Sequence, residues 1–363
     1  MSGEAFMLTS FDGGLPPEAD LALAEPPAGT TGYGENHAFW CMDGENRVHF
    51  YAHVEAFQDC FRLRIERHWI ALPDGTVYYD FSDGWRSTPR QPAGANLVFT
   101  CVEPFRHWEV DFLGTMRISS AAEQAKGRPV EGPRALVRYH LDVDVAAPPM
   151  RNGQLPNATA DATSMRMMGG ERYEQLIRVS GWFEIDGRRV EMAGAGIRTH
   201  RRGTRDLADW YGHSWQSALF PSGRGFHLNV FPGAPGLAGR AAPRLSEACL
   251  IEDGMLVPAE VVECSWLDTY APKGDRSRVI LRAGKREAVI EAEVVSTSWR
   301  TFHMDASQGR YLRPYGVWRD PASYANSQAA MRYVWDGEVT YGHAERSTAF
   351  ELVSDAPESV SWA

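Results

Sequence analysis

Titratable and aromatic side chains are concentrated between Gly194 and Phe231. A pocket that grips an apolar ligand and also moves a proton needs both kinds of side chain. We therefore predict a ligand site in this segment. The alternative is that its arginines and aspartates pair with one another on a surface loop. The residues concerned are Arg198, His200, Arg205, Asp206, Asp209, His213 and His227, with Trp210, Tyr211, Trp215, Phe220 and Phe226.

Asp206 and His213 are the predicted acid and base, because both titrate and lie among Trp and Arg residues that can shift a pKa. Arg198 and Arg205 would orient a carboxylate or donate hydrogen bonds to a phenolate or carbonyl, with His200 as their polar partner. These five residues form the predicted catalytic set. The predicted substrate-binding residues are Trp40, His53, Trp210, Tyr211, Trp215 and His227.

The remaining histidines lie in segments with a strand pattern. His49, Tyr51 and His53 share one strand face, so two imidazoles could point into a lumen together. A structural role is the commoner outcome for such histidines. Solvent contact is expected for three others on polar strand faces: His68, His107 and His140.

Other chemistries have little support in the sequence. There is no HExxH or HxH motif, and His200 has no carboxylate at ligand-like spacing, so we predict no metal. A zinc or iron site assembled from distant strands is the alternative. There is no GxGxxG or Walker motif either, so we predict no nucleotide cofactor. Ser214 is not part of a GxSxG elbow. The five cysteines form no CxxC pair and are expected to be reduced and mostly inert.

The charge balance excludes one class of partner. Lys and Arg number 37 against 47 Asp and Glu, which gives a net charge of −10, and there is no basic run. Nucleic-acid binding needs a clustered positive face, so we predict no nucleic acid. No stretch approaches the ~18 apolar residues of a membrane span. The N-terminal sequence lacks the charged and apolar regions of a signal peptide, and we expect a cytoplasmic protein.

The elements expected to position these residues are β-strands, because apolar residues recur at every second position. Alternating runs separated by tight turns predict hairpins. The fold class is therefore all-β, with closed or nearly closed barrels as one way to remove sheet edges. Only two segments could form short helices, residues 121–126 and 322–330. The alternating runs are 61–69 with 77–81, 135–143, 173–183 ending at Asp186-Gly187, 279–295 and 333–341.

The chain of 363 residues favours two domains. Residues 1–35 are rich in Gly, Pro and acidic residues and are expected to wrap the surface. Residues 146–170 are too long for a hairpin connection and predict a lid or a crossing at a domain edge. Another Gly/Pro-rich stretch, residues 232–243, interrupts the second half.

The segment from Tyr173 to His227 resembles the AttH-like and hydroxyneurosporene-synthase-like family. In that family a YEQ sequence, a strand–DG–strand unit and a GxRDHSWGxR element occur in this order. The matching residues here are Tyr173-Glu174-Gln175, Gly181, Asp186-Gly187, Gly194, Gly196, Arg198, His200, Gly203 and Arg205, then Trp210, Gly212-His213, Trp215, Phe226-His227, Asp336-Gly337, Gly342 and Glu345. Thr199 stands where the family has Asp, and Arg201-Arg202 where it has Ser-Trp, which puts catalysis by that Asp in doubt.

The resemblance covers about residues 35–350 and implies two lipocalin-like barrels side by side, which we divide at 1–185 and 186–363. It implies a cofactor-independent lyase of the hydratase or dehydratase type, acting on an apolar terpenoid, steroid or phenolic small molecule. An isomerase or cyclase, or a carrier that leaves its ligand unchanged, are the alternatives. Whether the ligand lies in one barrel or between the two stays open, and so does a homodimer. A fold shared with a family does not by itself settle activity.

Overall fold

The computed structural model describes residues 10–349 except 22, 24, 27, 58–59, 87–90, 126–131, 154, 207–209, 237–238, 270–272, 304–311 and 314–322. These described residues form two large antiparallel sheets and three short helices, α1 (Glu18–Leu21), α2 (Ala121–Ala125) and α3 (Ala162–Met168). None of these helices has the length and apolar character needed to cross a membrane.

The first sheet closes into an eight-stranded barrel, because β10 pairs with β11 as well as with β7. Its order is β11-β1-β2-β3-β4-β6-β7-β10, with β5 and β8 attached. The strands are β1 (Tyr33–Asp43), β2 (Val48–Phe57), β3 (Cys60–Ala71), β4 (Thr76–Trp85), β5 (Leu97–Glu103), β6 (His107–Ser120), β7 (Arg134–Val145), β8 (Met150–Arg151), β10 (Glu171–Ile185) and β11 (Arg188–Thr204).

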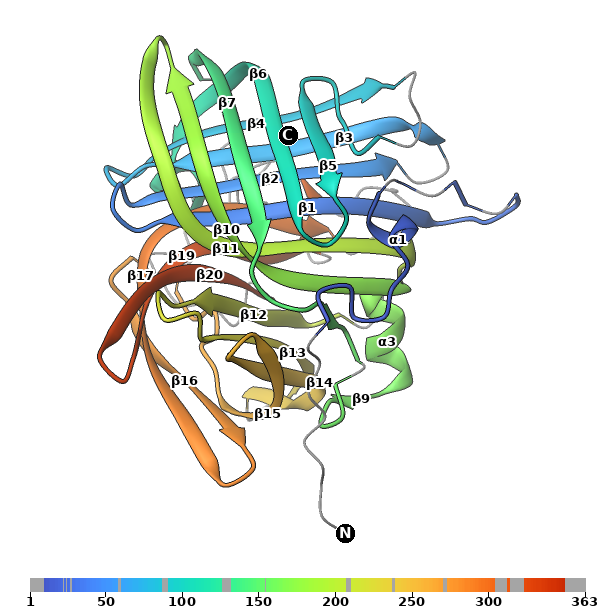
Figure 1. Cartoon of the computed structure of the whole chain (residues 1–363), viewed down its shortest axis with the longest axis vertical. Coiled ribbons are helices and arrows are strands. Elements are labelled where there is room, and N and C mark those ends of the chain that lie inside the picture. The colour runs from blue at the N-terminus through green and yellow to red at the C-terminus, as the bar shows by residue number, and fades with distance from the viewer. Residues whose placement is uncertain are drawn as a thin grey trace.

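The second sheet closes in the same way, through the pairing of β13 with β14. Its order is β13-β12-β20-β19-β17-β16-β15-β14, with β9 and β18 attached. Figure 1 shows this barrel below the first one. The strands are β9 (Thr159–Ala160), β12 (Gly212–Leu219), β13 (Gly225–Gly236), β14 (Gly239–Glu252), β15 (Met255–Glu263), β16 (Arg276–Ala283), β17 (Arg286–His303), β18 (Leu312–Arg313), β19 (Ser323–Trp335) and β20 (Glu338–Ala349).

The all-β prediction and its hairpins are confirmed. The predicted turns join β3 to β4, β10 to β11, β16 to β17 and β19 to β20. The first predicted helix corresponds to α2. The second helix, at 322–330, is wrong: residues from Ser323 onward form β19, which pairs with β17 on one side and β20 on the other. Two strand partners outweigh the weak helix propensity of a short Ala-rich stretch.

The connecting segments do more than cover the surface. The N-terminal segment was expected to wrap the outside, yet Ala19 and Asp20 in α1 are buried. Within residues 146–170, β8 pairs with β10 of the first sheet and β9 pairs with β14 of the second. This segment therefore crosses between the two barrels.

Strand pairing places the division between the barrels later than residue 185. Residues 185 and 186 lie in the β10–β11 hairpin, whose strands pair from Glu171 opposite Arg202 to Ile185 opposite Arg188. β11 also pairs with β1. Apart from β9, the first sheet thus continues to Thr204 and the second begins at Gly212.

Gly196 on β11 allows a close approach of two strands. A Cβ atom built there would lie 1.8 Å from the carbonyl oxygen of Trp40 on β1. We expect Gly196→Ala to lower the free energy of unfolding by about 2–3 kcal/mol, because backbone must move to admit the methyl group. Urea unfolding would measure this. Ala193→Ser, at an exposed position on the same strand, is the matched control and should change stability little.

Three apolar clusters show where the core lies. One fills the first barrel and includes Phe39, Trp108 and Tyr139, and another fills the second barrel and includes Phe226 and Tyr333. A third combines residues of both sheets and so lies between the barrels. It includes Trp40, Tyr51, Trp69, Trp215 and Leu219.

The polar face of β3 points into the first barrel. Arg64, Glu66 and His68 are each 0% exposed, and the Tyr139 hydroxyl lies 3.0 Å from His68 Nδ1. The expectation that His68 contacts solvent is therefore wrong, whereas His107 and His140 are partly exposed as expected. The opposite, apolar face of β3 is occupied by packing against the second barrel, so both faces of this strand are buried.

Candidate active site between the two barrels

The predicted catalytic and binding residues separate into two groups on opposite faces of the same strands. Arg198 and His200 point into the first barrel, where they contact Asp20 and Glu35. A second group lies on the side that faces the other barrel. It contains Trp40, His53, His213, Trp215 and His227.

Arg198 is held in the first barrel by a carboxylate from α1. Its Nη1 and Nη2 atoms lie 2.8 and 3.0 Å from the two oxygens of Asp20, and its Nε donates to Gln175. Asp20 also accepts from the Phe105 amide and the Tyr173 hydroxyl. Burial disfavours its charge, but the Arg198 guanidinium and these bonds hold the pKa of Asp20 below its usual range. Arg198 is therefore occupied in a structural ion pair.

His200 lies beside this pair. Its Nε2 is 2.8 Å from Glu35 and its Nδ1 is 3.2 Å from the Tyr173 hydroxyl. The His37 ring stacks on the His200 ring with 3.9 Å between centroids. The long separation of Glu35 and His200 in the sequence explains why this carboxylate was missed.

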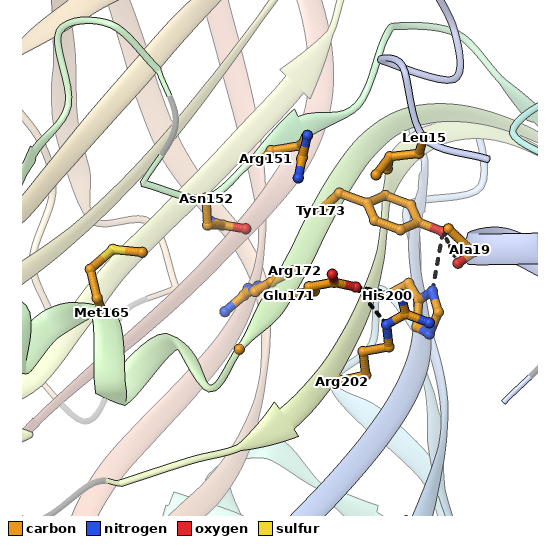
Figure 2. Close-up of a pocket in the computed structure, with 11 residues that line it drawn as sticks. Leu15, Ala19, Arg151, Asn152, Met165, Glu171, Arg172, Tyr173, His200 and Arg202 are labelled. Carbon is orange, nitrogen blue, oxygen red and sulfur yellow. Dashed lines mark hydrogen bonds and ion pairs between the residues drawn. The ribbon is translucent and has the colours of Figure 1, made fainter. Parts of the chain in front are cut away.

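A pocket of about 90 Å³ opens beside His200 (Figure 2). Its polar lining includes Arg151, Arg172 and Arg202, and Tyr173 and His200 form part of its wall. Pockets for drug-sized ligands measure roughly 300–1,000 Å³, so this space suits a small group or ion and not a whole terpenoid or steroid.

Aromatic rings from both barrels meet around His343 of β20. The His343 ring lies 5.0 Å from Trp40 of the first barrel and 5.0 Å from Trp215 of the second, measured between centroids. Trp40 also packs against Tyr51 at 4.8 Å, and Trp40 and Trp215 meet edge to face. We call these four residues, together with His49, Arg300, Glu345 and His213, the inter-barrel cluster.

His343 has no hydrogen-bond partner among the described residues. Both of its ring nitrogens are buried without a hydrogen bond, and the same holds for His49, whose ring lies 6.5 Å away. Burial lowers the pKa of His343 well below its usual value and that of His49 to about 3, so both rings are neutral at pH 7. Buried polar atoms are nearly always bonded, so an unpaired imidazole between two barrels indicates a ligand or water position.

A chain of charged groups lies next to His343. Arg300 donates to the Tyr51 hydroxyl at 3.2 Å and to Glu345 at 2.9 Å. Glu345 in turn lies 3.1 Å from His213 Nε2. Burial opposes the charge of Glu345, but Arg300 and His213 outweigh it and lower its pKa to about 2. His213 also contacts Ser347 through Nδ1, so it is fully bonded and positions Glu345.

The Tyr51 hydroxyl remains available as a donor. It accepts from Arg300, which leaves its own hydrogen for another acceptor. Burial raises the pKa of Tyr51 to about 12, so the hydroxyl is protonated at neutral pH. Tyr51 and His343 pack against the same ring, that of Trp40.

A second polar group lies beyond Trp215. Glu174 accepts from Trp215 Nε1 at 2.9 Å and lies 3.0 Å from His227 Nε2. Nearby Glu247 accepts from Asn152 and from the Gly153 amide. Burial raises the pKa of Glu247 to about 7. Since Glu345 is ionised, the two carboxyl groups hold their protons over different pH ranges.

Two other predicted residues lie beside the inter-barrel cluster: Trp210 packs against His213, and the Arg205 charge acts on His213 and Glu345. The Asp206 side chain is 58% exposed and lies 4.0 Å from Arg166. Arg205 donates to the Met167 carbonyl. The remaining residues singled out between Gly194 and Phe231 include Trp210, Tyr211 and Asp209. Trp210 packs beside His213 at 5.3 Å, Tyr211 lies under the Arg244 guanidinium, and Asp209 is outside the described residues.

Sequence reasoning missed three central members of the cluster: His343, Glu345 and Arg300. Glu345 did appear in the family resemblance, and Gly342-His343-Ala344-Glu345 has the two-residue period that places His343 and Glu345 on one face. Arg300 had no distinguishing signal in the sequence. Only the contact between barrels shows that these side chains face Trp40 and Tyr51.

Three solved structures are similar to this chain. A putative AttH from Nitrosomonas europaea has a TM-score of 0.49 and 12% identity, covering 90% of this chain and 99% of that one. Kievitone hydratase from Nectria haematococca has a TM-score of 0.48 and 8% identity, covering 89% and 90%. CghA has a TM-score of 0.46 and 13% identity, covering 94% and 97%. An AttH, the namesake of the family that the sequence resembles, is thus among the similar structures.

Fold and site together define a protein of two closed β-barrels with a buried polar cluster between them. At the level of sequence, the model of the family described as "Domain of unknown function (DUF7064)" matches residues 18–349. The chain belongs to this DUF7064 family. No curated protein matches it in sequence.

Proposed function

We propose that the chain catalyses proton transfer on an apolar or phenolic small molecule bound at the inter-barrel cluster, as a hydratase or dehydratase. The observation that carries this proposal is His343: a neutral, buried imidazole between Trp40 and Trp215 with no partner among the described residues. Such a group is unprotonated at neutral pH, so a ring nitrogen has a lone pair for a proton of the ligand, and the two indole rings offer apolar walls.

The groups around His343 fit an elimination of water. In this reaction His343 takes the proton from the carbon next to a carbonyl, and Tyr51 donates a hydrogen bond to the carbonyl oxygen as it gains negative charge. His343 then returns the proton to the departing β-hydroxyl group, so water leaves and a double bond forms. Hydration is the same path in reverse.

In this mechanism Arg300 and Glu345 support Tyr51, and His213 holds Glu345 in place. Arg300 fixes the Tyr51 hydroxyl, and Glu345 neutralises the guanidinium charge in the buried site. The sequence assigned the oxygen-binding role to Arg198 and Arg205. We transfer it to Tyr51 backed by Arg300, because Arg198 is already paired with Asp20.

Isotope labelling tests the proposed reaction. We would incubate the protein with apolar α,β-unsaturated phenolic ketones in heavy-oxygen water and analyse the products by mass spectrometry. The wild-type protein is expected to form a product that carries one oxygen from the solvent. We expect His343→Gln to reduce turnover about 10²–10⁴-fold and Tyr51→Phe about 10²–10³-fold. His140→Gln, on the outer face of the first barrel, is the matched control and should retain activity.

Other outcomes would point to the alternatives. A rearranged product without solvent oxygen, still dependent on His343, would make the protein an isomerase or cyclase that uses the same base. Recovery of bound ligand unchanged from the wild-type protein would make it a carrier. Full activity of His343→Gln would contradict the role of His343.

A further inference from the structure

Three buried side chains in the first barrel form a group with the composition of a metal site. Glu35 and His37 come from β1 and His200 from β11, and one ligand atom of each lies within 4.8 Å of the others. All three are at most 2% exposed. Two imidazoles and one carboxylate are the protein ligands of many zinc and iron sites.

His37 supplies an independent observation that points to a ligand. It is 1% exposed, and among the described residues neither of its ring nitrogens has a hydrogen-bond partner. Leaving a buried donor and acceptor unpaired destabilises the folded protein. His37 stacks on His200 with an interplanar angle of 18°, and the register of β1 and β11 sets the two residues opposite each other.

The surroundings of His200 resemble the outer shell of a metal site. Ligating histidines usually bond a second group through their other nitrogen, which fixes the ring. His200 Nε2 points to Glu35, while its Nδ1 contacts the Tyr173 hydroxyl, which is itself bonded to Asp20. Arg198, a nearby cation, is paired with Asp20 through both carboxylate oxygens, and Glu35 accepts a further hydrogen bond from the Tyr33 hydroxyl.

We propose that Glu35, His37 and His200 bind a divalent zinc ion inside the first barrel. One of the three, His200, also lines the pocket in Figure 2, together with its partner Tyr173. The inference does not depend on the proposed function, since these ligands and the inter-barrel cluster lie on opposite faces of β1.

The sequence could not show this site. Glu35 and His37 have ligand-like spacing with each other but no third ligand nearby, and His200 joins them only through the antiparallel register that sets His37 opposite His200. The spacing rules applied to the sequence find sites within one segment. They do not find a site between β1 and β11, which are neighbours in the barrel but lie far apart in the sequence.

Metal binding by the purified, full-length protein tests the proposal. After removal of metals with a chelator, the protein would be titrated with Zn²⁺ and, separately, with Co²⁺, whose visible spectrum reports its ligands. We expect one tightly bound Zn²⁺ per chain and a raised melting temperature. His37→Gln and Glu35→Gln should each abolish this binding, while Tyr173→Phe should weaken it about 10–100-fold.

A surface group provides the matched control. His107, Glu109 and Asp142 also lie close enough together to hold a cation, on the partly exposed outer face of β6 and β7. His107→Gln should leave the tight Zn²⁺ unchanged. Binding that is lost in His107→Gln and retained in a folded His37→Gln protein would overturn the proposal, and so would a wild-type protein that binds no Zn²⁺. Circular dichroism would establish that each variant is folded.

Discussion

Asp20→Ala is expected to lower the free energy of unfolding by about 3–5 kcal/mol, because it leaves the Arg198 charge buried without its carboxylate. Asp20 is 0% and Arg198 1% exposed, so water cannot replace the lost partner without opening the barrel. Asp20 also accepts hydrogen bonds from the Phe105 amide and from Tyr173. Urea unfolding at neutral pH would measure the loss, which is a large part of the ~5–15 kcal/mol typical of a folded protein.

A second variant separates the buried charge from simple loss of packing. Arg198→Met in the Asp20→Ala background removes the unpaired charge and keeps most of the side-chain volume, so the double variant should be more stable than Asp20→Ala alone. Asp12→Ala, at an exposed position of the same N-terminal segment, should change stability by less than about 0.5 kcal/mol. Equal loss in Asp12→Ala and Asp20→Ala would show that the ion pair does not anchor α1.

The second large effect is expected with pH. Three histidines between the two barrels are buried and neutral: His49, His53 and His343. Burial is the main cause of their lowered pKa values, and Arg67 next to His53 and Arg300 add to it. The unfolded chain takes up protons on these residues below pH about 6.5, whereas the folded chain does not.

The sign follows from the protons bound in each state. Since the unfolded state binds more protons below pH 6.5, stability falls as the pH falls. From pH 7 to 5 three such histidines remove about 5–6 kcal/mol. Glu247 acts in the opposite direction, because its pKa is raised to about 7 and the folded state binds its proton more tightly. Its contribution of about 2 kcal/mol leaves a net loss of about 3–4 kcal/mol from these four groups. His37, buried inside the first barrel with its pKa also lowered mainly by burial, adds to the loss.

Urea unfolding at a series of pH values between 7 and 5 would measure this loss. His49→Gln should reduce the average slope of stability against pH between 7 and 5 by about 1 kcal/mol per pH unit, because one fewer histidine takes up a proton only in the unfolded state. Ala193→Ser, at an exposed position without a titratable group, should leave the slope unchanged. Equal stability at pH 7 and pH 5 would contradict the neutral, buried state of these histidines.

The sequence by itself determined the strands of this protein. A side-chain period of two and turns such as Asp186-Gly187 are local properties, since each depends on residues that are neighbours in the chain. Asp186 and Gly187 adopt φ angles of 48° and 82°, which Asn, Asp and Gly tolerate best. The predicted hairpins therefore appear in the structure, and so does the short helix at α2.

Only the tertiary structure decided which strand face is inside. The alternation in β3 places His68 on one face and Trp69 on the other, but it does not say which face lines the barrel. In a single barrel the polar face would contact water. Here the apolar face packs against a second barrel, so His68 is enclosed with Phe112 and Tyr139.

The sites depended on tertiary structure for the same reason. Asp206 lies near Arg166 on an exposed segment, whereas the buried His213 meets Glu345 from a strand near the other end of the chain. A sequence pattern shows that titratable groups lie among aromatic ones, as it did for Trp40, Trp215 and His213. Barrel closure and the packing of two barrels select the partners, because both bring together strands that are far apart in the chain.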